Sequence, residues 1–156
     1  MEIKLLGQCP EYTSTIAQWL FDEFSHLEQE PISAEALEKR LSSRINLKKC
    51  PLTCIFFHDD LPIGTASLVD DDGLKVCSHL SPWLADVYVV PSYRRQRVGE
   101  SLTRHVTNLA KLNGHKKCYL YTENQQAFFA SLGWTQQTHA PICHNKVLVT
   151  VMELPL

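Results

Sequence analysis

The stretch "DVYVVPSYRRQRVGESLTRHVTNL", residues 86–109, decides how this chain is interpreted. It begins with β-branched and aromatic residues typical of a buried strand, passes through a proline and a basic turn, and continues with apolar residues at helical spacing. In a strand, turn and helix of this kind, the unpaired N–H groups of the first helical turn point at one place. Together with the helix dipole, these groups predict an anion-binding site at residues 95–101.

The residues of the turn support an anion site. Gly99 lets a ligand approach the backbone closely, and Arg94, Arg95 and Arg97 supply charge for phosphate oxygens. The alternative is that "RRQR" is a solvated cluster at the start of a helix. Basic residues there oppose the helix dipole at about 0.3–1 kcal/mol each, and a bound anion would remove that conflict. The sequence contains neither GxGxxG nor GxxxxGK[ST], so the common nucleotide-binding motifs are excluded.

Length and composition predict one globular domain over residues 1–156. The chain has 156 residues, of which 44% are hydrophobic and 21% charged, values that argue against disorder and coiled coils. The net charge of -2 argues against a protein that coats nucleic acid, so no nucleic-acid partner is expected. Any anion site must therefore be local.

The N-terminal sequence and the cysteines indicate the compartment. "MEIKLLGQCP" has no long apolar run, so we expect neither a secretory signal nor a membrane span, and a cytoplasmic location follows by default. The 6 cysteines include no CxxC pair and lie mostly among apolar neighbours. They predict reduced structural thiols and no metal site.

Hydrophobic periodicity predicts the element order β α α β β β α β α β β. Expected strands are 2–6, 52–60, 61–73, 83–90, 116–122, 134–141 and 145–154. Expected helices run from Glu11 to near Pro31, from a Ser33 N-cap to before Pro51, from 98 to a stop at Asn113-Gly114, and from an Asn124 N-cap to Gly133. The three central strands read as an antiparallel meander. The fold class is therefore α/β (α+β), with a mixed, mostly antiparallel sheet and about four helices.

The segment "VYVVPSYRRQRVGESL" resembles the acetyl-CoA-binding motif of the GNAT acetyltransferases, V-x-P-x-x-R-x-x-G-x-G/A. Val89, Pro91, Arg94 and Gly99 match the motif. The resemblance continues through "CYLYTENQQAFFASLGW" to the family's next strand and its aromatic helix, and covers about residues 83 to 134. It implies the GNAT fold and acetyl-CoA as cosubstrate.

The resemblance also implies where coenzyme A lies. The pyrophosphate would be held by backbone N–H groups from Arg95 through Glu100 or Ser101, and the pantetheine arm would pair with residues 87–89 as an extra strand does. The implied cofactor-contacting residues are Val87, Tyr88, Val89, Arg94, Arg95, Gln96, Arg97, Val98, Gly99, Glu100 and Ser101.

Two residues depart from the family pattern. Arg97 stands where the motif usually has glycine, so either this position has an ordinary helical φ or cofactor binding is weaker, unless the arginine compensates by touching phosphate. Phe129 stands where many relatives carry a tyrosine that protonates the leaving thiolate. Tyr121, and after it Tyr119, is the candidate for that catalytic role, with half-buried packing as the alternative. The thiolate can also leave without a dedicated acid.

Candidates for the acceptor site come from the positions that such a fold would give them. Phe24, His26 and Trp83 are expected to line the substrate pocket, with core packing as the alternative for Phe24. The candidates for a general base are Asp86, His79, Glu23 and His26. Strand alternation places Asp86 and Tyr88 on the face opposite Ala85, Val87 and Val89, unless a bulge shifts the count. The run Asp70–Asp72 reads as a solvated hairpin cap that could also attract a cationic acceptor.

These residues lead to one function and one alternative. The predicted function is an N-acetyltransferase that transfers the acetyl group of acetyl-CoA to a primary amine of a small molecule or of a peptide or protein. The alternative is a non-catalytic acyl-CoA-binding module with a degenerate active site, which Arg97 and Phe129 would mark. The expected assembly is a monomer or homodimer. The sequence does not name the acceptor.

Overall fold

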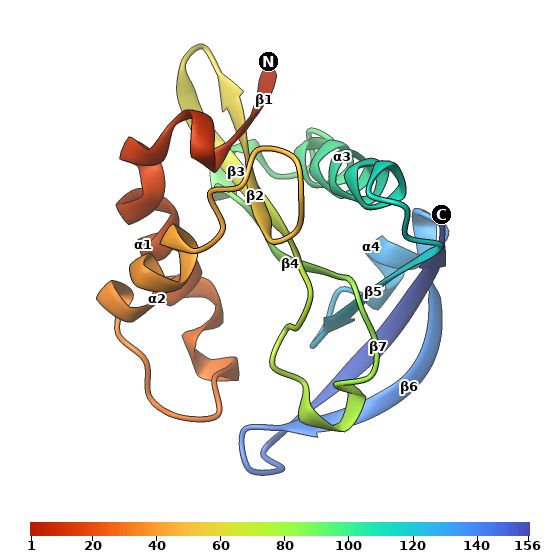
Figure 1. The fold of residues 1–156 in the computed structure, drawn as a ribbon. Helices are drawn as coiled ribbons and strands as arrows, with labels where there is room; N and C mark the ends of the chain where they lie inside the picture. The colour runs from red at the N-terminus through yellow and green to blue at the C-terminus, as the bar shows by residue number, and fades with distance from the viewer.

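The computed structural model describes residues 1–156 and consists of one seven-stranded sheet with helices on both faces (Figure 1). The strands are β1 (Glu2–Leu5), β2 (Leu52–His58), β3 (Leu61–Val69), β4 (Trp83–Val89), β5 (Lys117–Thr122), β6 (Thr135–Ile142) and β7 (Val147–Pro155). The helices are α1 (Thr13–Phe24), α2 (Ala34–Ser42), α3 (Val98–Leu112) and α4 (Gln126–Ser131). The predicted fold class and the predicted order of these elements are confirmed.

The strand order in the sheet is β1-β2-β3-β4-β5-β7-β6. Strands β2, β3 and β4 form the expected antiparallel meander. β4 and β5 are the one parallel pair, because the chain crosses over through α3 between them. The final hairpin inserts β7 between β5 and β6.

Helices α1 and α2 cover one face of the sheet (Figure 1). Ile16 and Leu20 of α1 and Leu41 of α2 are buried in a cluster with Ile55 and Phe57 of β2. The α2 N-cap is as predicted, since the N–H of Ala36 donates to Ser33 Oγ at 3.1 Å. α1 is shorter than predicted: it ends at Phe24 and continues as a 3₁₀ turn over Ser25–Leu27. His26 and Leu27 of that turn line the cavity described below.

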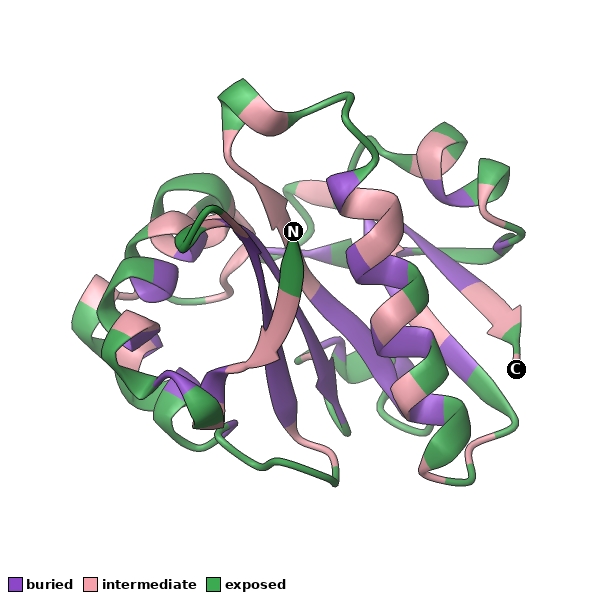
Figure 2. Ribbon diagram, turned by 90° about the horizontal axis from the view of Figure 1, so that it is seen from above, coloured by how far each residue is buried: buried purple, intermediate pink, exposed green.

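Helix α3 lies on the opposite face and buries a stripe of residues spaced by four (Figure 2). The stripe is Val98, Leu102, Val106 and Ala110, each no more than 2% exposed. Gly64 of β3 permits the close approach: a Cβ there would lie 2.9 Å from the carbonyl oxygen of Tyr88 and 3.1 Å from Leu102 Cδ1. This contact fixes the N-terminal end of α3 next to β4.

The short helix α4 is capped differently from the prediction. The N–H of Gln125 donates to Thr122 Oγ1 at 3.0 Å, while the side chain of Asn124 accepts only from Gln125 Nε2. Asn124 as N-cap was therefore wrong, because the last residue of β5 reaches the free N–H first. The predicted glycine stops are confirmed, with positive φ at Gly114 (88°) and Gly133 (95°).

All six cysteines are free and five are buried, as expected for structural thiols. None of the helices combines the length and the apolar character that a membrane crossing requires.

Candidate active site

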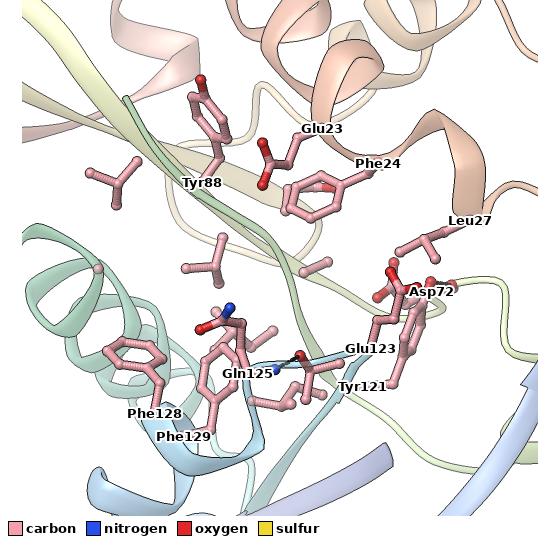
Figure 3. Close-up of a pocket in the computed structure, with 18 of the residues that line it drawn as sticks. Glu23, Phe24, Leu27, Asp72, Tyr88, Tyr121, Glu123, Gln125, Phe128 and Phe129 are labelled. Carbon is pink, nitrogen blue, oxygen red and sulfur yellow. Dashed lines mark hydrogen bonds between the residues drawn. The ribbon is translucent and has the colours of Figure 1, made fainter. Parts of the chain in front are cut away.

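Strands β4 and β5 are neighbours at one end and separate toward the other. Their parallel register contains one pair, Trp83 opposite Tyr119, so the edge of β4 that faces β5 is free beyond Trp83. A cavity of about 1040 Å³ opens where the strands separate, and residues of α1, β4, the start of α3, β5 and α4 line it (Figure 3). The cavity thus has one end at the start of α3 and another near the end of α1.

The α3 end of the cavity carries a run of free backbone donors. No N–H group from Arg95 to Glu100 donates a hydrogen bond within the protein, whereas Arg94 donates to Pro91 O at 3.2 Å and Ser101 donates to Arg97 O at 3.0 Å. These free groups coincide with the positive end of the α3 dipole. The predicted donors are therefore available, except that the N–H of Ser101 is used inside the helix.

Arg95 and Arg97 have left-handed backbone conformations, with φ of 63° and 62°. The ordinary helical φ considered for Arg97 is therefore ruled out, and each residue costs about 1–2 kcal/mol relative to a right-handed conformation. Such alternation turns consecutive N–H groups toward one point and forms an anion-binding concavity. Both side chains line the cavity and neither forms an ion pair. Gln96 and Ser101, also expected to contact the cofactor, are not among the lining residues.

Gly99 provides space beside this turn. A Cβ at this position would lie 3.4 Å from Phe128 Cζ and 3.6 Å from Val89 Cγ2. The glycine thus leaves the space between β4, α3 and α4 free of a side chain. A methyl group would fit with small shifts, whereas a larger or charged side chain would enter the anion site.

The side chain of Arg94 is engaged in contacts with other residues of the protein. Its Nε donates to the carbonyl oxygen of Val89 at 2.9 Å, its Nη2 lies 3.4 Å from Glu23 Oε2, and its guanidinium lies 5.7 Å from the ring centre of Tyr88. Arg94 therefore holds the turn after β4 against α1. Arg95 and Arg97 remain as the free cations of the turn.

A bulge in β4 brings Asp86 into the cavity. The β3–β4 register shifts between Thr65 and Ser67, and Asp86 has a φ of 57°. Val87 and Val89 pack beneath α3, whereas Ala85 belongs to the cluster around Trp83. The prediction that Ala85 shares a face with Val87 and Val89 was wrong because the bulge adds a residue between them.

Arg44, in the turn after α2, pairs with Asp86 at 2.5 Å. Both side chains are largely buried, at 10% and 20% exposed. The ion pair thus joins the bulge of β4 to the turn after α2. Nothing near Arg44 in the sequence indicates this contact, because 42 residues separate the partners.

The other end of the cavity lies between α1 and β5 (Figure 3). Phe24, Leu27 and Glu23 line it, so the expectation for Phe24 is consistent with the structure. His26 also lines it and its Nε2 lies 2.8 Å from Glu123 Oε2 of the segment after β5. The candidate base His79 is exposed on the loop between β3 and β4 and lies outside the cavity.

The turn between β6 and β7 closes this end. The thiol of Cys143 donates to the carbonyl oxygens of His26 and Glu28, both at 3.3 Å. The N–H of His144 donates to Gln29 Oε1 at 3.2 Å. Segments 26–29 and 143–144 are thereby joined, and residues 26–29 line this end of the cavity.

Trp83 does not line the cavity, contrary to prediction. It is 1% exposed, its indole N–H donates to Leu80 O at 2.7 Å, and its ring packs 6.1 Å from that of Tyr121. A tryptophan at the start of a central strand fills the core where β4 and β5 are still paired. Its contribution to the site is to support Tyr121.

Tyr121 lines the cavity and is half-buried. Its hydroxyl donates to the carbonyl oxygen of Asp72 at 3.3 Å, and burial together with the charges of Asp72 and Asp86 raises the pKa of Tyr121 well above its usual range. Phe129 also lines the cavity and packs against Trp134 with ring centres 6.2 Å apart. Among the lining residues, β5 thus supplies a tyrosine hydroxyl, whereas α4 supplies only the phenyl rings of Phe128 and Phe129.

The sequence alone does not distinguish Asp72 from its neighbours Asp70 and Asp71. Asp70 and Asp71 are exposed, as expected for a hairpin cap, but Asp72 turns into the cavity beside Tyr121 (Figure 3). Burial, and after it the charge of Asp86, raises the pKa of Asp72 well above its ordinary value. The run of three acids contained no local signal to single out its last member.

Comparisons with known proteins agree with this geometry. The sequence pattern of the acetyltransferase (GNAT) family matches residues 13–134. A search of curated proteins finds no match. Among solved structures, yncA from Salmonella typhimurium, determined with acetyl-CoA, is 19% identical with a TM-score of 0.72, covering 100% of this chain and 94% of that one.

Two further structures have the same fold. An aminoglycoside 6'-N-acetyltransferase complexed with coenzyme A is 13% identical with a TM-score of 0.77, covering 99% of this chain and 97% of that one. The ribosomal-protein-alanine N-acetyltransferase from Brucella melitensis is 14% identical with a TM-score of 0.73, covering 100% of both chains. At these identities the likeness establishes the fold, and the sequence match over residues 13–134 establishes membership: this chain belongs to the GNAT family of acetyltransferases.

Proposed function

We propose that this protein is an N-acetyltransferase that transfers the acetyl group of acetyl-CoA to a primary amine of a small molecule or of a peptide or protein. The observation that carries the proposal is the run of unpaired N–H groups from Arg95 to Glu100, which faces a cavity beside the free edge of β4. An anion and an extended chain are the two ligands that these features bind. Coenzyme A supplies both in one molecule.

The residues present fit coenzyme A. Its pyrophosphate would accept from the N–H groups of residues 95–100, with the unpaired guanidinium groups of Arg95 and Arg97 adjacent. Gly99 leaves room for it, since even a Cβ would contact Phe128. The pantetheine arm would pair with the free edge of β4, as one more strand. The structures of yncA and of the aminoglycoside 6'-N-acetyltransferase hold acetyl-CoA and coenzyme A.

The charges at the two ends of the cavity favour an amine as acceptor. Unpaired cations, Arg95 and Arg97, lie at the α3 end, and an unpaired carboxylate, that of Asp72, lies at the opposite end. A negatively charged cofactor and a positively charged acceptor would each find the opposite charge. Two of the similar structures are named for transfer to nitrogen, which is in keeping with this choice.

In the proposed reaction, the amine nitrogen attacks the thioester directly while both substrates are bound. A main-chain N–H of the Val87–Val89 segment would stabilise the negative charge that develops on the carbonyl oxygen. The ion pair between Arg44 and Asp86 holds the bulge that precedes this segment. Tyr121 is the candidate donor to the leaving thiolate because it is the one tyrosine of β5 among the lining residues.

The second candidate function is an acyl-CoA-binding module without catalysis. Phe129 favours it, because its side chain has no proton to give and is packed against Trp134. Both functions predict binding of acetyl-CoA, and turnover separates them.

The test measures thiol release from acetyl-CoA with kanamycin, spermidine, lysine and a peptide with a free N-terminal alanine. Mass spectrometry of the product checks that one acetyl group has been added to nitrogen. We expect saturable, amine-dependent release. Tight binding of acetyl-CoA without release for any amine would favour the binding module, and absence of binding would overturn both functions.

A further inference from the structure

One of the carboxylates that line the cavity, that of Asp72, differs from the others because it has no partner. Each of the others has a partner: Glu23 with Arg94, Glu28 with Arg40, Asp86 with Arg44, Glu100 with Arg104, Glu123 with His26, and Asp71 with the N–H of Gly73. Asp72 has neither an ion pair nor a side-chain hydrogen bond. Asp72 is therefore the one lining carboxylate whose oxygens bond to no group of the protein.

The position of this carboxylate is fixed by its backbone. The hydroxyl of Tyr121 donates to the carbonyl oxygen of Asp72, and Tyr121 is itself held by Trp83. Asp72 therefore lies beside Tyr121 of β5 (Figure 3), and the charge of Asp86 on β4 acts on it. The proposed thioester position, along β4 beyond Trp83, borders the same space.

We propose that Asp72 binds the ammonium group of the acceptor and takes its proton, so that the acceptor is recognised as a cation. This assignment rests on the proposed function. An uncompensated carboxylate at the end of a cavity recovers a charge-assisted hydrogen bond when an ammonium group binds. The same carboxylate is then within hydrogen-bond reach of the proton that must leave before nitrogen can attack.

The proton balance of the step is complete. An N–H bond of the ammonium group breaks, its electron pair remains on nitrogen, and the proton forms an O–H bond on Asp72. The nitrogen then forms the C–N bond to the acetyl carbon, and the C–S bond breaks with its electron pair on sulfur. The second proton lost by nitrogen goes to the thiolate, and the proton on Asp72 returns to solvent.

The remaining carboxylates are less suited to this role. Asp86 is held by Arg44 at 2.5 Å and Glu28 by both Nη atoms of Arg40, at 2.7 and 3.3 Å. Glu123 lies at the mouth and contacts His26. A carboxylate already bound to a cation is a weaker base, because the partner stabilises its ionised form.

The groups facing Asp72 determine its basicity. They are Asp86 of β4, Arg44 and Arg40 from α2 and the turn after it, Glu28 after α1 and Tyr121 of β5. Burial and Asp86 act in the same direction and raise the pKa of Asp72, which makes its ionised form a stronger proton acceptor. Activity should therefore rise with pH as Asp72 ionises.

The test uses the amine of the panel above with the highest kcat/KM and its analogue with hydroxyl in place of ammonium. Asp72→Asn, Asp72→Glu and the exposed, non-lining control Asp70→Asn are compared with wild type. We expect Asp72→Asn to lower kcat by about 10²–10⁴ and to lose the rise of kcat/KM with pH, with Asp72→Glu partly restoring both. Calorimetry on the coenzyme A complexes should show that wild type prefers the amine to its hydroxyl analogue and that Asp72→Asn does not. Acetyl-CoA affinity should be equal in all four proteins.

The outcomes separate this proposal from the proposed function. Turnover by Asp72→Asn with the wild-type rate and pH profile would overturn the role of Asp72 and leave N-acetylation standing. A reduced rate with an unchanged pH profile and unchanged preference for the amine would also overturn it, because it would indicate a structural role alone. If wild type acetylates none of the amines, the proposed function fails, and the assignment of Asp72 fails with it.

Discussion

Arg44 and Asp86 form an ion pair of 2.5 Å that joins the turn after α2 to the bulge of β4. Removing the arginine leaves a largely buried carboxylate without a partner, next to Asp72. We expect Arg44→Met to lower the free energy of unfolding by about 3 kcal/mol, measured by urea denaturation. Arg44→Met combined with Asp86→Asn should recover much of this loss, since no charge is then stranded.

The control for this prediction is Arg40→Met. Arg40 pairs with Glu28, but their side chains are 41% and 30% exposed, so the loss should be under about 1 kcal/mol. Equal losses for the two methionine variants would contradict the assigned importance of the Arg44 pair.

Gly99→Asp tests the anion site. Asp at the start of a helix suits the dipole, so the variant should fold, but its carboxylate would occupy the place of the pyrophosphate. We expect thermal stabilisation by acetyl-CoA to be lost in Gly99→Asp and largely retained in Gly99→Ala, whose Cβ lies 3.4 Å from Phe128. Equal acetyl-CoA affinity in wild type and Gly99→Asp would place the cofactor elsewhere.

Arg97 has a strained backbone conformation and a charged side chain, and two variants test these two properties separately. Arg97→Gly removes both the guanidinium and the cost of φ = 62°, whereas Arg97→Ala removes only the guanidinium. Without ligand, the glycine variant should be more stable than the alanine variant by about 1–2 kcal/mol in urea denaturation. Acetyl-CoA affinity should be weaker in Arg97→Ala than in wild type, because a phosphate contact is lost. An unchanged affinity would show that Arg97 does not touch phosphate.

Tyr121→Phe tests how the thiolate leaves. If Tyr121 is the acid, kcat should fall by about 10²–10⁴ with little change in acetyl-CoA affinity. If instead the thiolate leaves unassisted, Tyr121→Phe should be nearly as active as wild type, and Phe129→Tyr, which adds a tyrosine hydroxyl on α4, should accelerate turnover. A wild-type kcat in Tyr121→Phe, once circular dichroism confirms folding, would eliminate the donor role.

Asp72 should make stability depend on pH. Its pKa is raised from 3.8 in the folded protein, so the folded state retains a proton that the unfolded chain releases above about pH 4. Stability therefore falls as pH rises from about 4 toward the raised pKa. Asp72→Asn should raise Tm at neutral pH, and this gain should vanish as pH falls toward 4. Asp70→Asn, on the exposed part of the same turn, should show no such pH-dependent gain.

Local patterns sufficed for the elements and for the unpaired N–H groups at the start of α3. The Ser33 cap, the stops at Gly114 and Gly133 and the strand-turn-helix around Gly99 each follow from a few neighbouring residues, and each is present in the structure. Such features depend on backbone conformation and spacing, which the sequence expresses locally. The free donors of residues 95–100 follow from the same reasoning.

The surroundings of Trp83, Asp72 and Asp86 could not be predicted in the same way. Trp83 and Asp72 acquire their roles from tertiary position: the tryptophan fills the core where β4 and β5 still pair, and the aspartate turns inward beside Tyr121. The bulge at Asp86 reverses the strand count at Ala85 and depends on a partner 42 residues away. Contacts of this range leave no periodic signal.

The thiol of Cys143 is a chemical probe of motion beside the cavity. Its Sγ donates to two carbonyl oxygens of the segment after α1 and the residue is 7% exposed, so a maleimide can reach it only when segments 26–29 and 143–144 part. Burial also raises the pKa of this thiol, which slows its background reaction. The rate of alkylation at Cys143, followed by peptide mapping, therefore reports how often these two segments separate. A bound acceptor that keeps the segments together would slow alkylation without contacting the cysteine.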